Sequence, residues 1–129
     1  MQNSNLSGRA LVVDDQQTLL SVAEDMLTAR GMEVLLADNG PQAIDLFQAH
    51  HDEINVVLLD FKMPNMNGAE IFTKLREIKP DVQVVISSGY SEEETSDFFS
   101  KNPDVLFLQK PYRFHTLVET IATALAQSH

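Results

Sequence analysis

The sequence predicts an α/β fold, a doubly wound parallel sheet of five strands with five helices, in the strand order 2-1-3-4-5. Short apolar runs alternate five times along the chain with segments in which apolar residues recur at helical spacing. The runs are rich in Val, Leu and Ile and nearly continuous, which is typical of strands buried on both faces. Four of the five runs end in acidic, hydroxyl or lysine side chains.

The first half of the chain supplies two strands and two helices. Gly31 follows the first helix, as glycine often does after a helix C-terminus, and Pro41 occupies an early position of the second. The apolar face of the first helix comprises Leu19, Leu20, Ala23, Met26 and Leu27. The predicted elements are the strand Ala10–Val13, the helix Gln16–Arg30, the strand Glu33–Ala37 and the helix Pro41–His50.

The second half supplies three strands and three helices. The fourth helix begins with the acidic run Glu92–Glu94 and has no apolar residue before Phe98, so we expect it to be the most mobile element. The acidic run is either a solvated face or a determinant of partner choice. The predicted elements are the strand Asn55–Asp60, the helix Gly68–Ile78, the strand Gln83–Ser87, the helix Ser91–Ser100, the strand Val105–Gln109 and the helix Phe114–Ala126.

Length and composition predict one domain over residues 9–129, preceded by a flexible segment over residues 1–8. No apolar run approaches the roughly 20 residues that span a bilayer, and no secretory signal is visible, so we expect no membrane contact. The chain has no cysteine, which fits a reducing cytoplasm. Its net charge of −10 argues against direct nucleic-acid binding, which needs a basic surface.

The reactive side chains of the chain lie at or directly after the ends of four predicted strands. Asp14-Asp15 follow the first strand, Asp60 ends the third, Ser87-Ser88 close the fourth, and Lys110 follows the fifth. Each has an ordinary explanation alone, as a helix cap, a turn or an exposed lysine. The carboxyl ends of parallel strands meet at one edge, however, and four independent turns would seldom produce this set. Crowded carboxylates favour a cation such as Mg²⁺, and an aspartate can accept a phosphoryl group.

These residues match a family pattern. From about Arg9 to Ala126 the chain resembles the receiver domain of two-component response regulators, a CheY-like domain with a flavodoxin-like fold. The matching stretches are Val12-Val13-Asp14-Asp15, Val57-Leu58-Leu59-Asp60 running through Met63-Pro64-Asn65-Met66-Asn67-Gly68, Ser88-Gly89 and Lys110-Pro111.

The resemblance implies a role for each matching residue at the site. Asp60 would be the phosphoacceptor, and Lys110, joined to Pro111 by a cis bond, would contact the phosphoryl group. Asp15, Asp60 and the backbone carbonyl of Lys62 would ligate Mg²⁺ directly, and Asp14 would act through water.

The resemblance also implies a switch and partners. Ser88 would be the switch hydroxyl and Phe107 the switch aromatic, which together remodel the face formed by the fourth helix, fifth strand and fifth helix. A histidine kinase or histidine phosphotransfer domain would supply the phosphoryl group. The remodelled face would meet an output domain or downstream protein, and a phosphorylation-dependent homodimer is a further expectation. No external substrate would be turned over, so the chain would not be an enzyme in the usual sense.

Two departures from the family pattern stand out. The switch aromatic is Phe107 and offers no phenol for a hydrogen bond. Lys62 and Tyr90 each stand two residues after a site residue, and we hypothesise that this bulky pair slows loss of the phosphoryl group.

Three rival functions fit the residues less well. Haloacid dehalogenase-like phosphatases carry a second acid two residues after the nucleophile, where this chain has Lys62. A flavodoxin-like cofactor binder must cradle a phosphate in its first loop, which the charge of Asp14-Asp15 would repel. A degenerate, purely scaffolding receiver is disfavoured because all five key positions are filled. The sequence stretches around Ser88 and Lys110 resemble those of receiver domains in hybrid sensor histidine kinases. A stand-alone response regulator fits the sequence equally well.

Overall fold

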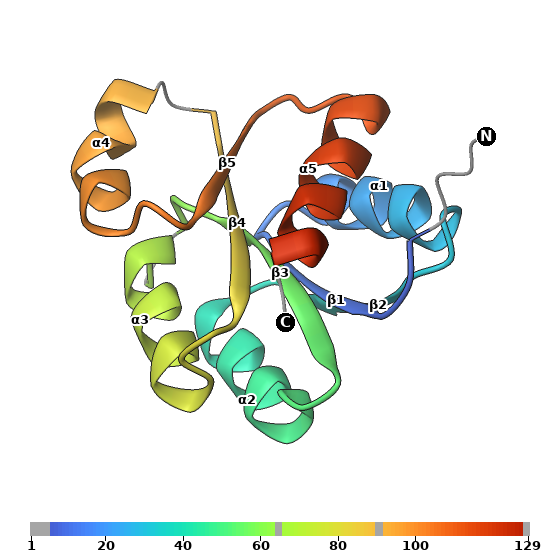
Figure 1. Cartoon of the computed structure of the whole chain (residues 1–129), viewed down its shortest axis with the longest axis horizontal. Coiled ribbons are helices and arrows are strands. Elements are labelled where there is room, and N and C mark those ends of the chain that lie inside the picture. Colours follow the sequence, from blue (N-terminus) through green and yellow to red (C-terminus); the bar gives the residue numbers. More distant parts are fainter. Residues whose placement is uncertain (1–5, 64–65, 90–91, 128–129) are drawn as a thin grey trace.

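The chain forms a five-stranded parallel sheet in the order β2-β1-β3-β4-β5, which confirms the predicted topology (Figure 1). The computed structural model describes residues 6–63, 66–89 and 92–127, and of 92–94 only the backbone. No strand boundary differs from its predicted position by more than one residue. The strands are β1 (Arg9–Val13), β2 (Glu33–Ala37), β3 (Ile54–Asp60), β4 (Gln83–Ser88) and β5 (Leu106–Gln109).

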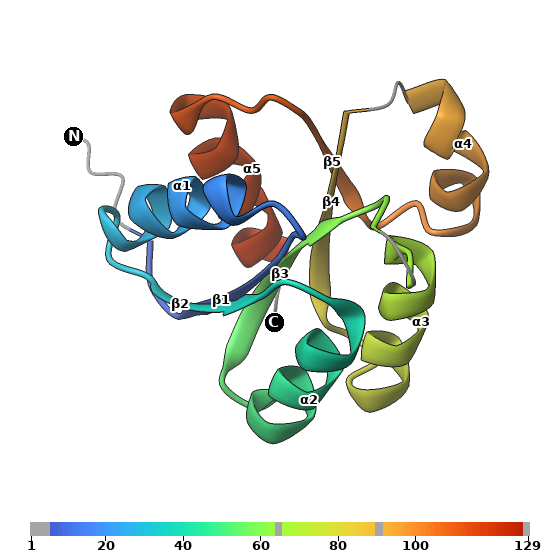
Figure 2. The ribbon, with the colours of Figure 1, turned by 180° about the vertical axis from the view of Figure 1, so that it is seen from behind.

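Five helices cover the two faces of the sheet. Helices α1 and α5 lie on one face, and α2 and α3 lie on the other, with α4 beside α3 towards the β5 edge (Figures 1 and 2). The predicted Ser91 start of α4 lies outside the described residues. The helices are α1 (Gln17–Thr28), α2 (Gly40–His50), α3 (Gly68–Ile78), α4 (Glu92–Lys101) and α5 (Phe114–Gln127).

The sheet separates two apolar clusters. On one side, which we call the α1/α5 core, the helices contribute Leu20, Ala23, Leu27, Leu117, Ile121 and Ala124. On the other side, the α2/α3 core, they contribute Ala43, Phe47, Ile71, Phe72 and Leu75. Alternate residues of the central strands point into one core or the other, because successive strand side chains face opposite ways.

The edge strands are less buried than the sequence predicts. β2 fully buries Ala37 and β5 fully buries Leu108, whereas the other residues of these two strands are half-buried or exposed. An edge strand has one neighbour instead of two, and here the helices cover its faces incompletely. The prediction of burial on both faces is therefore right for β1, β3 and β4 and wrong for β2 and β5.

Helix α1 starts and stops inside its predicted range. Gln16 is its N-cap residue, and it ends at Thr28, two residues before the predicted Arg30. Gly31 then adopts a φ of +98°, a conformation that glycine reaches without steric cost. Across this turn the Met32 N–H donates to the Leu27 carbonyl at 3.1 Å, so the chain turns back directly into β2.

Helix α4 packs against the body through three of its described side chains. Among its described side chains, Thr95 is buried and Phe98 and Phe99 are half-buried, while the others are exposed. The buried Thr95 was not foreseen, because the sequence offered no apolar anchor before Phe98. The expected mobility of α4 remains a prediction.

A chain of aromatic rings passes through α4. Phe98 packs edge-on against Phe61 and Phe72, with ring centroids 5.4 and 5.1 Å away. Phe99 contacts Phe98 at 5.3 Å and Phe107 of β5 at 5.7 Å. We call Phe61, Phe98, Phe99 and Phe107 the aromatic chain. It links the residue after Asp60 to β5 by way of α4.

The amino-terminal part of the chain is described from Leu6 onwards. The Leu6 N–H donates to the Arg30 carbonyl at 2.7 Å, and its side chain packs against the α1/α5 core. Residues 1–5 of the predicted flexible segment lie outside the described part. Within the described ranges, no helix combines the length and apolar character needed to cross a membrane.

Candidate functional site

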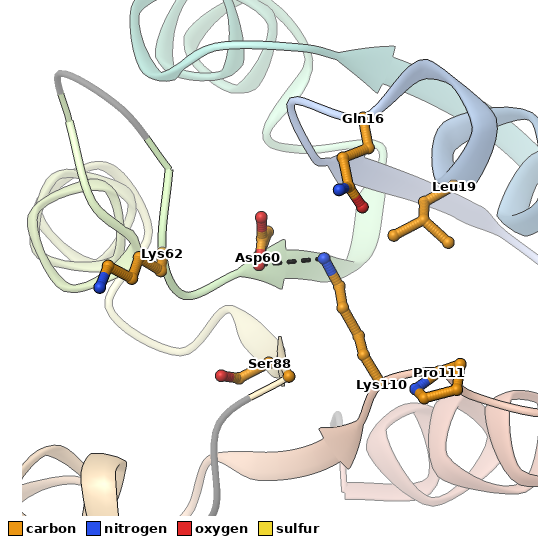
Figure 3. A pocket seen from close by; sticks show the side chains of 8 residues that line it. Gln16, Leu19, Asp60, Lys62, Ser88, Lys110 and Pro111 are labelled. Carbon is orange, nitrogen blue, oxygen red and sulfur yellow. Dashed lines mark ion pairs between the residues drawn. The ribbon is translucent and has the colours of Figure 1, made fainter.

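A pocket of about 560 Å³ opens at the carboxyl edge of the sheet (Figure 3). Strands β3, β4 and β5 deliver residues to it at their ends, and the start of α1 closes one side. This is the edge at which open parallel sheets bind their ligands. The pocket is lined by Gln16, Leu19, Asp60, Lys62, Ser88, Gly89, Lys110 and Pro111.

Three carboxylates meet at this edge. Asp14 and Asp60 are buried, with 3% and 5% of their surface exposed, and Asp15 is exposed. One oxygen from each lies within 4.8 Å of the others. Asp14 follows β1, where its N–H donates to the Ala37 carbonyl of β2 at 3.1 Å. The N-cap residue of α1 is Gln16, and its side chain makes no capping bond, so neither acid occupies the cap position. Asp14 Oδ1 does accept from the Gln16 N–H at 2.9 Å, just before the helix begins.

Lys110 bridges the two buried carboxylates. Its Nζ lies 2.8 Å from Asp14 Oδ2 and 3.2 Å from Asp60 Oδ1. The Lys110 N–H donates to the Ser88 carbonyl at 2.8 Å, which fixes the residue against the end of β4. The Lys110-Pro111 bond is cis, which confirms that prediction.

The charges in the pocket are unbalanced. Burial, followed by the charge of Asp14, raises the pKa of Asp60 from 3.8 to about 6, and the nearby Lys110 only partly opposes this. Burial and then the charges of Asp14 and Asp60 also raise the pKa of Tyr112 to about 12. One ammonium is therefore insufficient for three carboxylates, and a further cation would stabilise the ionised site.

These residues fit a hard divalent cation. Mg²⁺ takes oxygen ligands, commonly one or two carboxylates with waters. Asp14, Asp15 and Asp60 each offer an oxygen within 4.8 Å of the others. Burial and the charge of Asp14 disfavour the ionised form of Asp60, and a cation at this position would offset that cost. Lys62 lines the same pocket, and ligation by its carbonyl remains a prediction.

The loop from β3 to α3 is shaped by a close backbone approach. The Phe61 N–H donates to the Ser87 carbonyl at 2.9 Å, and the Gly68 N–H donates to the Phe61 carbonyl at 2.7 Å. A Cβ on Gly68 would lie 2.7 Å from Phe61 Cα and 2.8 Å from the Asp60 carbonyl, so only glycine fits. Asn67 then caps α3 reciprocally with Glu70, which fixes where the loop ends. Of this motif, Pro64 and Asn65 lie outside the described residues.

The two predicted switch residues occupy different places. Ser88 is buried, with 1% exposed, and lines the pocket next to Asp60 and Lys110. Phe107 is half-buried and pairs in register with Ile86, away from the pocket. It contacts Phe99 of α4 instead. The structure thus gathers all the predicted site residues except Phe107 at one edge of the sheet.

Sequence reasoning missed two residues that line the pocket. Leu19 was assigned to the buried face of α1, yet it is half-buried and faces the site. Gln16 was treated only as the start of a helix. The available signal was position, because both residues lie shortly after the acidic pair that follows β1, where α1 begins.

The arrangement can perform nucleophilic chemistry on an anion. Asp60 supplies a carboxylate oxygen in a pocket open to solvent on one side, and Lys110 supplies positive charge beside it. Ser88 adds a hydroxyl at the same wall. A carboxylate nucleophile with a lysine and a hydroxyl donor suits the capture of a phosphoryl group.

The chain matches known proteins along most of its length. Residues 10–122 match the family model described as the response regulator receiver domain. The autoinducer 1 sensor kinase/phosphatase LuxN of Vibrio campbellii is 32% identical over 117 residues, which cover 91% of this chain and 13% of that protein. The transcriptional regulatory protein ZraR of Escherichia coli is 32% identical over 119 residues, which cover 92% of this chain and 26% of that protein.

A solved structure shares the fold. The response regulator receiver domain protein of Clostridium thermocellum superposes with a TM-score of 0.86 at 28% identity, covering 93% of this chain and 95% of that one. The chain therefore spans a minor part of the curated relatives and nearly the whole of this structural one.

Proposed function

The chain belongs to the response regulator receiver domain family, and on this premise we propose that Asp60 accepts a phosphoryl group in a two-component phosphorelay. The observation that carries the proposal is the buried Asp60 carboxylate, crowded by Asp14 and Asp15 and paired with Lys110 in an open pocket. Such a carboxylate holds negative charge that a metal ion would balance, and its oxygen is placed to attack.

The residues have distinct tasks in this reaction. An Asp60 oxygen attacks the phosphorus, a bond forms between them, and the bond from phosphorus to the donor breaks. Lys110 pairs with one phosphoryl oxygen and the Ser88 hydroxyl donates to another. Bound Mg²⁺ would neutralise charge on the phosphoryl oxygens. Asp15, Asp60 and the Lys62 carbonyl would hold it directly, and Asp14 through water.

The outcome of the reaction is a change in the conformation of the domain itself, and no external substrate is turned over. The new phosphoryl oxygens draw the Ser88 hydroxyl, and Phe107 changes its packing against α4 in response. The consequence is a population shift that alters the face formed by α4, β5 and α5. That face meets an output domain, a downstream protein or a second phosphorylated copy of the chain.

The phosphoryl donor is a histidine kinase or a histidine phosphotransfer domain in the cytoplasm. Relatives include a sensor kinase and a transcriptional regulator, so the same domain serves within a hybrid kinase or beside a separate output module. With a net charge of −10, this domain acts on transcription only through another domain or protein.

Intact mass spectrometry with a small phosphodonor tests the proposal. The protein is incubated with acetyl phosphate, with Mg²⁺ or with a chelator, beside Asp60→Asn. Asp81→Asn serves as a matched control, since Asp81 is exposed at the opposite, amino end of β4. We expect one phosphoryl adduct that requires Mg²⁺, persists in Asp81→Asn and is absent in Asp60→Asn. No adduct under conditions that load another receiver would favour a scaffolding role.

A further inference from the structure

Gln16 is fixed firmly at the mouth of the pocket by its backbone. Its N–H donates to Asp14 Oδ1 at 2.9 Å. Its carbonyl accepts from the N–H groups of Leu19 and Leu20, at 3.0 and 3.1 Å, as the first turn of α1 forms. The side chain takes no part in capping the helix, although the residue occupies the N-cap position.

The Gln16 side chain is available for a ligand. It lines the pocket with Asp60, and its carboxamide end is turned towards the Asp60–Lys110 ion pair (Figure 3). Within the described part of the chain the carboxamide makes no hydrogen bond. The neighbouring Gln17 differs, because its Nε2 donates to Asp38 Oδ2 at 3.1 Å. Two adjacent glutamines therefore have different surroundings.

We infer that the Gln16 carboxamide holds the water that hydrolyses the phosphoryl group from Asp60. The inference rests on the proposed function of Asp60. In this step the water oxygen forms a bond to phosphorus while the bond from phosphorus to the Asp60 oxygen breaks. Asp60 leaves as a carboxylate, and the proton released by the water passes to the departing phosphate, so inorganic phosphate is the other product.

A carboxamide suits this task because its oxygen accepts a hydrogen bond from the water and leaves a water lone pair free to face phosphorus. The carboxamide takes no proton itself. Being neutral, it adds no repulsion to a pocket that already holds three carboxylates.

Three of the other lining residues are less suited than Gln16. Lys110 is engaged with Asp14 and Asp60. The Lys62 side chain extends away from Asp60 (Figure 3), and Leu19 is apolar. Leu19 lies beside Gln16 in the first turn of α1 and lines the same pocket.

The test separates phosphoryl uptake from phosphoryl loss. The full chain is loaded from acetyl phosphate with Mg²⁺, freed of the donor, and followed by intact mass as the adduct decays. The variants are Gln16→Ala, Gln16→Leu, which keeps the bulk without the amide, and the matched control Gln17→Ala. Gln16 is exposed, so these replacements leave the core intact.

We expect loss to slow about tenfold in both Gln16 variants, the effect of one well-placed hydrogen bond, while uptake stays within about twofold. Uptake uses no attacking water, so loss of a residue that only positions the water should slow hydrolysis alone. Loss of a purely structural residue should change the rates of uptake and hydrolysis together. Gln17→Ala should behave as the wild type. Unchanged loss in the Gln16 variants, or equal slowing of uptake and loss, overturns the inference. Failure of the wild type to form any adduct refutes the proposed function, and this inference with it.

Discussion

Phe61, the residue directly after Asp60, packs edge-on against Phe98 of α4, with ring centroids 5.4 Å apart. Phe61 also donates its N–H to the Ser87 carbonyl at the end of β4. The residue beside the candidate phosphoacceptor therefore contacts α4. Among the described side chains of that helix, Phe98 and Phe99 are the apolar ones.

Replacing Phe98 with alanine should destabilise the protein and loosen α4. The half-buried ring contacts Phe61, Phe72 and Phe99, and its removal leaves a cavity that we expect to cost about 2 kcal/mol in the free energy of unfolding. Urea denaturation measures this cost. Relative to the wild type, hydrogen exchange should speed up more for α4 amides than for α5 amides. Ser100→Ala, an exposed change on the same helix, should alter neither quantity. An equal increase in both helices would contradict the role of the ring.

Replacing Asp60 with asparagine should stabilise the metal-free protein at neutral pH. Because the pKa of Asp60 is raised to about 6, folding favours its protonated form, and this stabilisation is lost as the pH rises through 6. The asparagine avoids the buried charge, so we expect it to unfold with a free energy on the order of 2 to 3 kcal/mol higher near pH 8.

The pH dependence distinguishes charge from packing. As the pH falls from 8 through 6 towards the ordinary value of 3.8, Asp60 becomes protonated in the folded and then in the unfolded chain, so the advantage of Asp60→Asn should shrink steadily towards pH 4. Urea denaturation in chelator from pH 4 to pH 8 measures it. Added Mg²⁺ should stabilise the wild type more than the variant. An advantage that is the same at every pH would rule out the charge of Asp60 as its cause.

Replacing Gly68 with alanine should destabilise the loop after β3. The new Cβ would collide with backbone atoms of Asp60 and Phe61, which cannot move away as a flexible side chain could. We expect a loss of about 2 kcal/mol or more in the free energy of unfolding, together with slower phosphoryl uptake. Gly89→Ala is the matched control for stability, since nothing lies within 4 Å of a Cβ there. Equal stability of the two variants would show that the loop relaxes freely.

Replacing both Lys62 and Tyr90 with alanine should shorten the lifetime of the phosphoryl group. Our hypothesis is that the two bulky side chains hinder the approach of water. Lys62 lines the pocket, whereas Tyr90 lies outside the described residues. Decay of the loaded protein, followed by intact mass, should be several-fold faster in the double variant. Slower decay than in the wild type would discard the hypothesis.

The fold was predictable because its signals are local. Alternation of apolar runs with helical segments needs no knowledge of tertiary contacts, and it places Asp14, Asp60, Ser88 and Lys110 at the strand ends or directly after them. The structure adds what periodicity cannot contain. The 2.8 Å contact between Lys110 and Asp14, and the extra burial that raises the pKa of Asp60, depend on how three strands align.

The residues that were missed share one cause. Thr95, Leu19 and Gln16 were each read by residue type or helix face, yet their surroundings come from elements distant in sequence. Thr95 is buried where α4 meets α3, and Leu19 and Gln16 face strands β3 and β5 across the pocket. The half-exposed edge strands have the same origin, since a strand's place in the sheet decides its burial.

The separation of the two cores by the sheet bears on how such a domain evolves. Phe61, Phe98 and Phe99 pack against the α2/α3 core, whereas α1 and α5 share the other core. Substitutions that are distant and share no neighbours have nearly additive effects on stability. Lineages can therefore remodel the α4 surface to acquire a new partner while the packing of α1 on α5 is inherited unchanged, and the reverse also holds.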